Sequence, residues 1–282
     1  MATVAQRTAI GLVLVGAFVG LLALDALTGR SFGVALLCLG LAVGGLVEYG
    51  RMIPAEEQLP RRLLVGFGAA YMALHGLGHE LDPRVLLLAT PCWLLFAAAV
   101  GFGCLRGSPS APRLRGVAFA ALGFVYLPVL GAFALEVRHV DPVAGPAAFF
   151  FVVAIAKGTD ACAFFAGKAF GRAKLIPGVS PGKSTAGFVG ALLGAAAIAA
   201  LFSWFSALGR LLPLPLAPGV GMLLALVVIS GDLVESFLKR AVDVKDSASL
   251  IPGFGGVLDV IDSVLAAAPA VYYLLLVARH LQ

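Results

Sequence analysis

The chain has 282 residues, of which 61% are hydrophobic and only 12% carry a charge. A globular domain of this length cannot bury so much apolar surface, so the composition excludes a soluble protein and indicates that most of the chain faces lipid. The net charge of +5 comes from basic residues scattered between apolar segments, which argues against nucleic-acid binding.

Apolar segments recur along the chain and predict an all-α, polytopic integral membrane protein with about nine transmembrane helices of roughly twenty residues each. Three prolines, Pro91, Pro128 and Pro146, lie inside apolar segments, where we expect kinks that neighbouring helices tolerate. The expected spans are 8–28, 32–50, 62–78, 85–105, 116–136, 143–167, 186–207, 213–234 and 262–280.

Lysine and arginine are unevenly distributed among the connections between these spans. The connections after the first, third, fifth and seventh spans hold only Arg30, Arg84, Arg138 and Arg210, whereas those after the even-numbered spans hold several basic residues each. The positive-inside rule therefore predicts that the even-numbered connections and the amino terminus face the cytoplasm.

Two groups of residues could be mistaken for metal or redox sites. The four cysteines lie singly within apolar segments, so we interpret them as structural thiols rather than as a disulfide or zinc site. His75 and His79 are four residues apart with Glu80 beside the second, but the zincin motif requires the glutamate next to the first histidine. We therefore expect these residues in a solvated loop on the outer face.

Two pairs of ionisable residues lie within or at the edge of predicted spans. Glu48 closes the second span and is expected to pair with Arg51, three residues on. Lys157 and Asp160 lie one helical turn apart inside an apolar span, where they could pair with each other.

Charged residues concentrate between Gly231 and Asp262, at the ends of apolar segments. Counted along a helix, Asp232 begins a face that continues at i+4, i+7 and i+8. The further members of this face are Ser236, Lys239 and Arg240.

Beyond Lys245 and Asp246, Gly255 and Gly256 allow a tight bend with exposed backbone amides. A helix that resumes here would aim Asp259 and Asp262 the same way, because they are three residues apart. Carboxylates without nearby histidines or thiols suit a hard cation such as magnesium, and neighbouring lysines and arginines suit phosphate. The stretch therefore predicts a site for a metal-bound polyphosphate. A basic loop with charges at the lipid headgroups is the alternative, but it does not explain acidic groups at membrane depth.

The segment 177–187 contains Gly182, Lys183 and Ser184, the last residues of a phosphate-binding P-loop. The first glycine of that motif would be at position 177, which is Pro177, and no strand is predicted before it. The P-loop interpretation is therefore rejected.

Both charged stretches resemble the phosphatidate cytidylyltransferases, membrane enzymes also called CDP-diacylglycerol synthases. The carboxyl-terminal stretch is similar to their signature at Ser236, Lys239, Arg240, Lys245, Asp246, Pro252, Gly253, Gly255, Gly256, Asp259 and Asp262. The upstream stretch resembles a second conserved region at Asp160, Ser180, Pro181, Lys183, Ser184 and Gly187. Three residues depart from the family pattern: Phe254, Val260 and Ala186 stand where the family usually has histidine, arginine and glutamate.

The resemblance implies transfer of a cytidylyl group from CTP to phosphatidate, with release of pyrophosphate. It assigns catalytic roles to Asp232, Ser236, Lys239, Arg240, Lys245 and Asp246. It assigns substrate binding to Asp160, Ser180, Lys183, Ser184, Gly255 and Gly256. It implies Mg²⁺, with room for a second cation, on Asp259, Asp262, Asp232 and Asp246.

The same resemblance predicts amino-terminal transmembrane helices in residues 1–142 and a transmembrane catalytic region in residues 143–282. The expected partners are CTP, phosphatidate and membrane lipids, and the resemblance leaves room for a homodimer. The active site is expected to face the cytoplasm from the plasma (inner) membrane.

Other functions stay open at this point. A transporter could use Lys157 and Asp160 as an ion path, although it should show inverted repeats and none is visible. The departures Phe254, Val260 and Ala186 would suit an inactive member of the family. A lipid kinase or a CDP-lipid synthase of another type would also use CTP at a membrane.

Overall fold

Long apolar helices form almost all of the structure, a computed structural model that describes residues 16, 18–25, 27–105, 108, 110–176, 180–244, 247 and 255–281. Among these residues, seven helical segments are long and apolar enough to cross a membrane: Phe32–Met52, Pro83–Gly103, Ala111–His139, Gly145–Phe170, Thr185–Phe205, Ala217–Ala241 and Val257–His280. The predicted all-α membrane fold is therefore confirmed, whereas the predicted count of about nine spans is not. Residues 8–15, 17 and 26 of the predicted first span, 8–28, lie outside the described residues.

The chain divides into two compact units. The first comprises Met1–Leu135 with Val242–Ile261, and the second comprises Glu136–Ala241 with Asp262–Gln282. The predicted boundary after residue 142 separates amino-terminal helices from a catalytic region, and this functional division stays a prediction.

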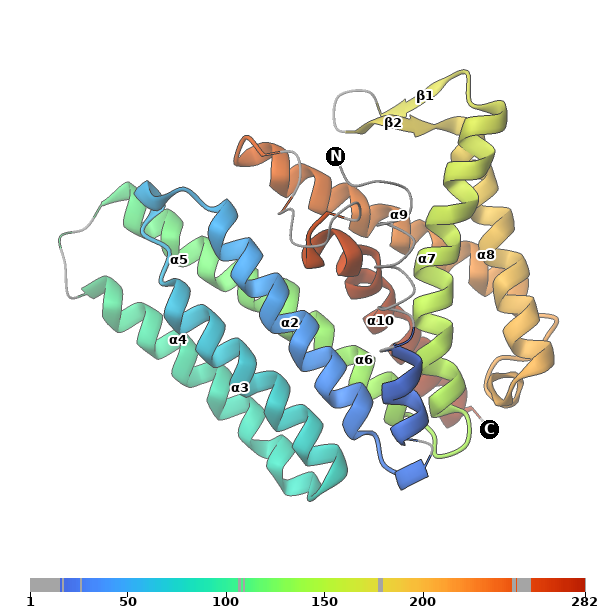
Figure 1. Ribbon diagram of the computed structural model, residues 1–282, viewed down its shortest axis with the longest axis horizontal. Helices are drawn as coiled ribbons and strands as arrows, with labels where there is room; N and C mark the ends of the chain where they lie inside the picture. The colour runs from blue at the N-terminus through green and yellow to red at the C-terminus, as the bar shows by residue number, and fades with distance from the viewer. Residues whose placement is uncertain are drawn as a thin grey trace. The chain divides into compact units, whose positions relative to one another are not determined.

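The first unit is built from helices α2 (Phe32–Met52), α3 (Arg61–Glu80), α4 (Ala89–Leu105) and α5 (Ala111–Phe124), followed by the first part of α6 (Leu130–His139) (Figure 1). Its largest fully buried side chains include Tyr49, Phe124 and Leu64. Between α5 and α6, the π-helical turn Val125–Val129 contains Pro128. Proline has no N–H for the regular helical ladder, so a local change of helix type at this position has a physical cause.

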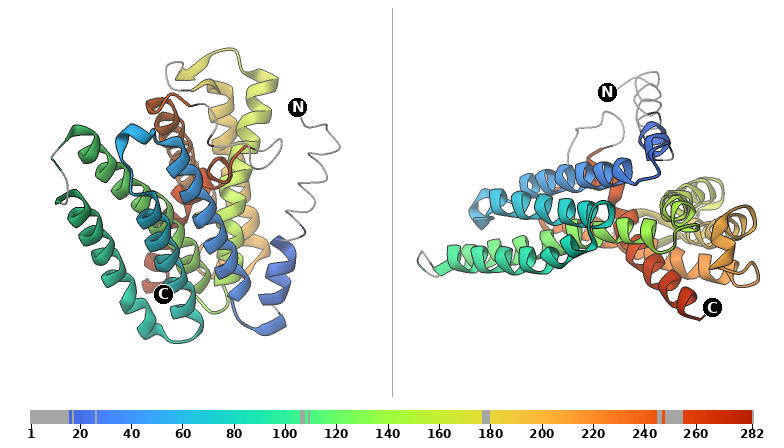
Figure 2. Two further views of the ribbon diagram at one scale, coloured as in Figure 1. Left: turned by 60° about the vertical axis from the view of Figure 1, so that its left-hand side comes forward. Right: turned by 90° about the horizontal axis from the view of Figure 1, so that it is seen from below.

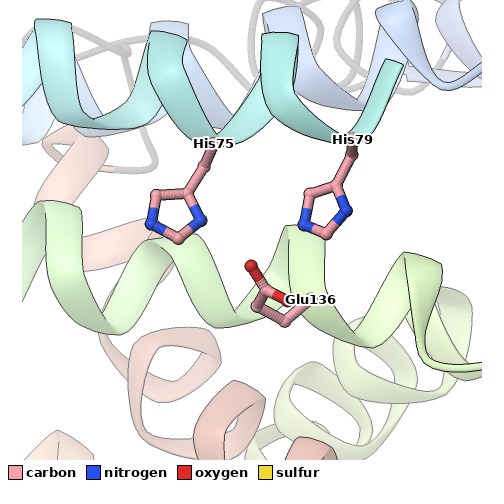
Figure 3. A group of neighbouring side chains, drawn as sticks. All are labelled: His75, His79 and Glu136. Carbon is pink, nitrogen blue, oxygen red and sulfur yellow. The ribbon is translucent and has the colours of Figure 1, made fainter. Parts of the chain in front are cut away.

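The expected loop around His75 and His79 is a helix instead. Both side chains project from one face of α3, one turn apart, as Figure 3 shows. Glu80 ends this helix, and its carboxylate accepts a hydrogen bond from the backbone N–H of Ser31 at 2.8 Å. The loop prediction was wrong because the histidines and the two glycines of this segment, Gly76 and Gly78, lower its apolar character without interrupting the helix.

The second unit contains α7 (Gly145–Phe170), α8 (Thr185–Phe205), α9 (Ala217–Ala241) and the larger part of α10 (Val257–His280). Helices α7, α8 and α9 lie side by side in Figures 1 and 2. Small residues permit this close packing: a Cβ added to Gly190 or Gly194 of α8 would collide with Ala166 or Cys162 of α7.

A short hairpin connects α7 to α8, and the sequence did not predict it. Strand β1 (Lys174–Ile176) pairs antiparallel with β2 (Ser180–Ser184), so that Lys174 lies opposite Ser184 and Ile176 opposite Ser180. The hairpin holds Lys183 next to the amino terminus of α8.

Candidate functional site

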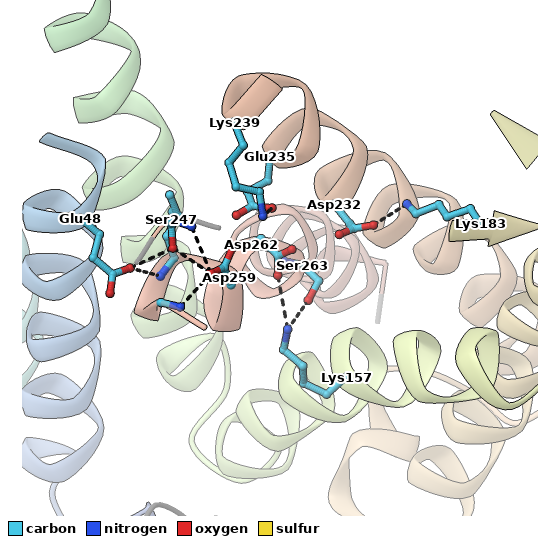
Figure 4. A network of polar contacts seen from close by, with 12 residues as sticks. Glu48, Lys157, Lys183, Asp232, Glu235, Lys239, Ser247, Asp259, Asp262 and Ser263 are labelled. Atoms are coloured by element: carbon cyan, nitrogen blue, oxygen red, sulfur yellow. Dashed lines mark hydrogen bonds and ion pairs between the residues drawn. The ribbon is translucent and has the colours of Figure 1, made fainter. Parts of the chain in front are cut away.

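Three carboxylates converge in the second unit. Asp232 and Glu235 lie three residues apart on α9, and Asp262 lies on α10. Each offers one oxygen, and these three oxygens lie within 4.8 Å of one another (Figure 4). Glu235 and Asp262 are buried, with exposed fractions of 2% and 5%, so their charges require close counter-charges.

Each of these carboxylates has a lysine beside it. Lys183, from β2, forms an ion pair with Asp232 at 2.5 Å and donates a hydrogen bond to the carbonyl of Ile229 at 3.3 Å. Lys239 lies one turn beyond Glu235 on α9 and pairs with it at 2.7 Å. The three carboxylates therefore alternate with ammonium groups, which lowers their mutual repulsion.

The third lysine, Lys157, comes from α7. Its ammonium lies 3.4 Å from Oδ1 of Asp262 and donates to Oγ of Ser263 at 2.7 Å. It also lies 3.7 Å from Oδ2 of Asp160 on its own helix, as the i,i+3 spacing predicted. Asp160 therefore joins the carboxylate cluster through Lys157.

A second polar arrangement lies in the first unit, around the start of α10. Glu48, fully buried on α2, accepts hydrogen bonds from the backbone N–H groups of Val257 and Leu258, both at 2.8 Å. It also accepts one from the hydroxyl of Ser247 at 3.2 Å. These contacts replace the predicted pairing with Arg51. An anionic side chain is favoured here because the first N–H groups of a helix lack intrahelical partners and carry partial positive charge.

Asp259 belongs to the same arrangement. Its Oδ2 accepts the backbone N–H of Gly256 at 2.7 Å and the hydroxyl of Ser247 at 2.9 Å. Because α10 begins at Val257, Asp259 is the third helical residue and reaches back to the N-cap, as in a capping box. In contrast to the expected common direction, Asp259 thus contacts the entry turn, whereas Asp262 contacts Lys157 and Ser263.

The glycines before α10 have a structural reason of their own. Gly255 has a φ of +89°, a conformation that glycine adopts without steric cost. At Gly256, a Cβ would collide with the hydroxyl of Ser247 and the carboxylate of Glu48. The predicted approach of these glycines to a nucleotide remains untested.

The remaining predicted residues are placed as follows. Ser184 is the N-cap of α8, where its Oγ accepts the N–H of Gly187 at 3.1 Å. Ser180 lies on β2, and Ser236 and Arg240 lie on α9, the latter exposed. Lys245, Asp246 and Phe254 lie outside the described residues.

Five residues of these two arrangements were not predicted as site residues. Lys157 was expected only as a partner of Asp160 or as part of a transporter's ion path. Glu235 could have been found, because it lies at i+3 from Asp232 on the helical face that the sequence indicated. Glu48, Ser247 and Ser263 could not be found this way, because their partners lie far away in the sequence or have no distinctive spacing.

The chain matches the sequence profile of the Cytidylyltransferase family over residues 5–278. It is 30% identical to the phosphatidate cytidylyltransferase of Chlamydia pneumoniae over 272 residues, which cover 88% of this chain and 84% of the relative. It is 37% identical to that of Pseudomonas aeruginosa over 227 residues, 80% of this chain and 81% of the relative. The match to that of Bacillus subtilis, 38% identical over 161 residues, covers 56% of this chain and 58% of the relative.

Proposed function

Because the chain belongs to the cytidylyltransferase family, we propose that it transfers a cytidylyl group from CTP to phosphatidate, giving CDP-diacylglycerol and pyrophosphate. The observation that carries this proposal is the cluster of Asp232, Glu235 and Asp262, set among lysines within apolar helices. Ionisable groups inside transmembrane segments are costly and are retained where they serve function.

The donor set of this cluster fits a divalent cation such as Mg²⁺. All three candidate ligands are carboxylates, two of them are buried, and hard cations prefer oxygen ligands. When bound, the cation would screen the triphosphate and stabilise the leaving pyrophosphate. Asp259 and Asp246 stay predicted ligands, since Asp259 contacts the entry turn of α10 and Asp246 lies outside the described residues.

The chemistry needs no strong base from the protein. The phosphate monoester of phosphatidate is largely ionised near neutral pH, so one of its oxygens can attack the α-phosphorus of CTP directly. A new P–O bond forms there while the bond to the pyrophosphate breaks, and pyrophosphate leaves with the electron pair. The protein must therefore neutralise two polyanions and hold them in line. Lys183, Lys239 and Arg240 are the groups that we assign to phosphate contacts.

The membrane supplies the lipid substrate to this site. The chain is an integral membrane protein, and we infer that its catalytic cluster opens to the cytoplasm, where CTP is available. The uneven distribution of lysine and arginine supports this orientation. A homodimer stays a prediction.

Labelled CTP distinguishes this reaction from the alternatives that the sequence left open. Purified protein is incubated with phosphatidate or diacylglycerol and with CTP labelled either in the cytosine ring or in the γ-phosphate. We expect the cytosine label, and not the γ-phosphate label, in the lipid fraction. This transfer should occur with phosphatidate and not with diacylglycerol. Transfer of the γ-phosphate label would identify a lipid kinase, and no transfer of either label would contradict enzymatic function.

A further inference from the structure

Lys157 is a charged residue in the interior of a transmembrane helix, beyond the residues assigned to the reaction. It lies near the middle of α7, a helix that is long and apolar enough to cross a membrane. Its ammonium contacts Ser263 at 2.7 Å, Asp262 at 3.4 Å and Asp160 at 3.7 Å. The carboxylate of Asp262 is almost fully buried, with 7% of its side chain exposed, so the loss of this ammonium would leave a buried negative charge uncompensated.

Lys157 differs from the other two lysines of the cluster in how it is held. Lys183 comes from a hairpin outside the spans and Lys239 from the last turn of α9, whereas Lys157 lies near the middle of a membrane-spanning helix. Lys157 has three side-chain partners, on α7 and α10. Turning it to a substrate would break all three contacts.

The charges of the cluster require a cation that remains in place. Asp160, Asp232, Glu235 and Asp262 supply four negative charges, and Lys183 and Lys239 would leave them when phosphates bind. One divalent cation then compensates only half of this charge. Lys157 already lies between Asp160 and Asp262 and supplies one of the two further positive charges.

We propose that the ammonium of Lys157 serves as a permanent cation of the catalytic cluster. It neutralises Asp160 and one oxygen of Asp262, so that the cluster binds one divalent ion rather than two. This inference rests on the proposed function, because it assigns the cluster to metal-dependent transfer. Lys157 acts as a positioning residue, since it orients the Asp262 carboxylate and does not touch the reacting atoms.

Manganese binding to the purified full-length chain tests the proposal without turnover. Mn²⁺ is titrated into wild-type protein, and the concentration of free Mn²⁺ is measured by electron paramagnetic resonance. We expect one tightly bound Mn²⁺ per chain. Lys157→Met should bind a second Mn²⁺, because Asp160 and Asp262 then lack their counter-charge, whereas Lys157→Arg should keep the count at one. Lys168→Met is the matched control: this lysine lies in the last turn of the same helix, 6.0 Å from the ring centre of Phe164.

Activity provides a second readout. Lys157→Met should lose at least tenfold in turnover at low Mg²⁺ and recover part of it as Mg²⁺ is raised, whereas Lys168→Met should follow the wild type. Two tightly bound Mn²⁺ ions in the wild-type chain would overturn the proposal, and this result does not depend on whether a variant folds. A Lys157→Met protein with one Mn²⁺ and unchanged turnover would overturn it as well. Wild-type protein that binds one Mn²⁺ but transfers no cytidylyl group would contradict only the proposed function.

Discussion

Glu48 caps the helix that begins at Val257, although the two residues are 209 positions apart in the sequence. The carboxylate of Glu48 lies where the amino terminus of a helix would bind an anion. It accepts the backbone N–H of Val257 at an N···O distance of 2.8 Å. Since Glu48 is fully buried, water cannot replace this acceptor. The cap therefore fixes the first turn of α10, which carries Asp259.

Replacement of Glu48 by glutamine tests this capping role. The neutral amide keeps one acceptor oxygen, so one of the two N–H groups at the start of α10 loses its acceptor and the other keeps only a neutral one. We expect the free energy of unfolding to fall by about 1–3 kcal/mol, the typical cost of a lost hydrogen bond to a charged group. Thermal unfolding in detergent measures this, with Glu56→Gln, an exposed glutamate of the turn Ala55–Glu57, as the control. Equal stability of the two variants would show that the cap contributes nothing.

Asp259 and Asp262 should respond differently to the same substitution. Asp259→Asn disrupts the capping contact with Gly256, so it should lower both the unfolding temperature and turnover. Asp262→Asn leaves the entry turn intact, so it should lower turnover and Mn²⁺ binding with little change in unfolding temperature. Each variant should retain less than about a tenth of the activity, a loss of at least ~1.4 kcal/mol in transition-state stabilisation. If Asp259→Asn retains more than this activity, Asp259 is not a residue of the active site.

Asp141 predicts how stability depends on pH. It lies between α6 and α7, where its carboxylate accepts the backbone N–H groups of Ala144 at 2.7 Å and Val143 at 2.9 Å. The hydrogen bond from Ala144, followed by that from Val143 and the positive charges of Arg279 and Arg210, holds the pKa of Asp141 below its ordinary value. A carboxylate with a lowered pKa stabilises the folded state above its unfolded pKa of about 4, and this contribution disappears as the pH falls through the folded pKa.

Asp141→Asn should therefore be less stable than the wild type near neutral pH. The difference in unfolding temperature should stay constant from about pH 7 to about pH 5 and shrink below about pH 4, where the wild-type carboxylate becomes protonated. Unfolding temperatures of both proteins across this range give the comparison. A difference that persists unchanged at the acidic end would mean that the charge of Asp141 does not stabilise the fold.

The departures from the family pattern should be tolerated. Val260 and Phe254 carry no charge where the family usually has arginine and histidine, but Lys183 and Lys239 lie beside the carboxylate cluster. Val260→Arg and Phe254→His should each change the rate by less than tenfold. If wild-type protein is inactive and the double reversion transfers cytidylyl groups, the chain is a degenerate relative of the enzymes it resembles.

The sequence predicted what depends on local spacing. Hydropathy located the membrane helices, and helical periodicity placed Asp232 and Lys239 on one face, where both join the carboxylate cluster. The i,i+3 spacing of Lys157 and Asp160 predicted their ion pair. These features require no knowledge of how distant segments meet.

Contacts between distant segments could not be predicted in this way. Nothing near Glu48 in the sequence indicates that its carboxylate caps α10, because the acceptor and the donors come from opposite ends of the chain. The hairpin was missed because β1 has only three residues and β2 contains a proline and a glycine, so neither strand shows the alternating pattern of a longer sheet. Asp259 looked like a partner of Asp262 by spacing, but its place in the first turn of α10 gave it backbone donors instead.

Formation of CDP-diacylglycerol by the purified chain is the direct test of the proposed function. Wild-type and Asp262→Asn proteins are incubated with CTP and phosphatidate, each with Mg²⁺ or with a chelator, and the lipid product is identified by mass spectrometry. We expect CDP-diacylglycerol only from wild-type protein with Mg²⁺, together with an equal amount of pyrophosphate. Equal product formation by wild-type and Asp262→Asn proteins, or by wild-type protein in the presence of the chelator, would contradict it.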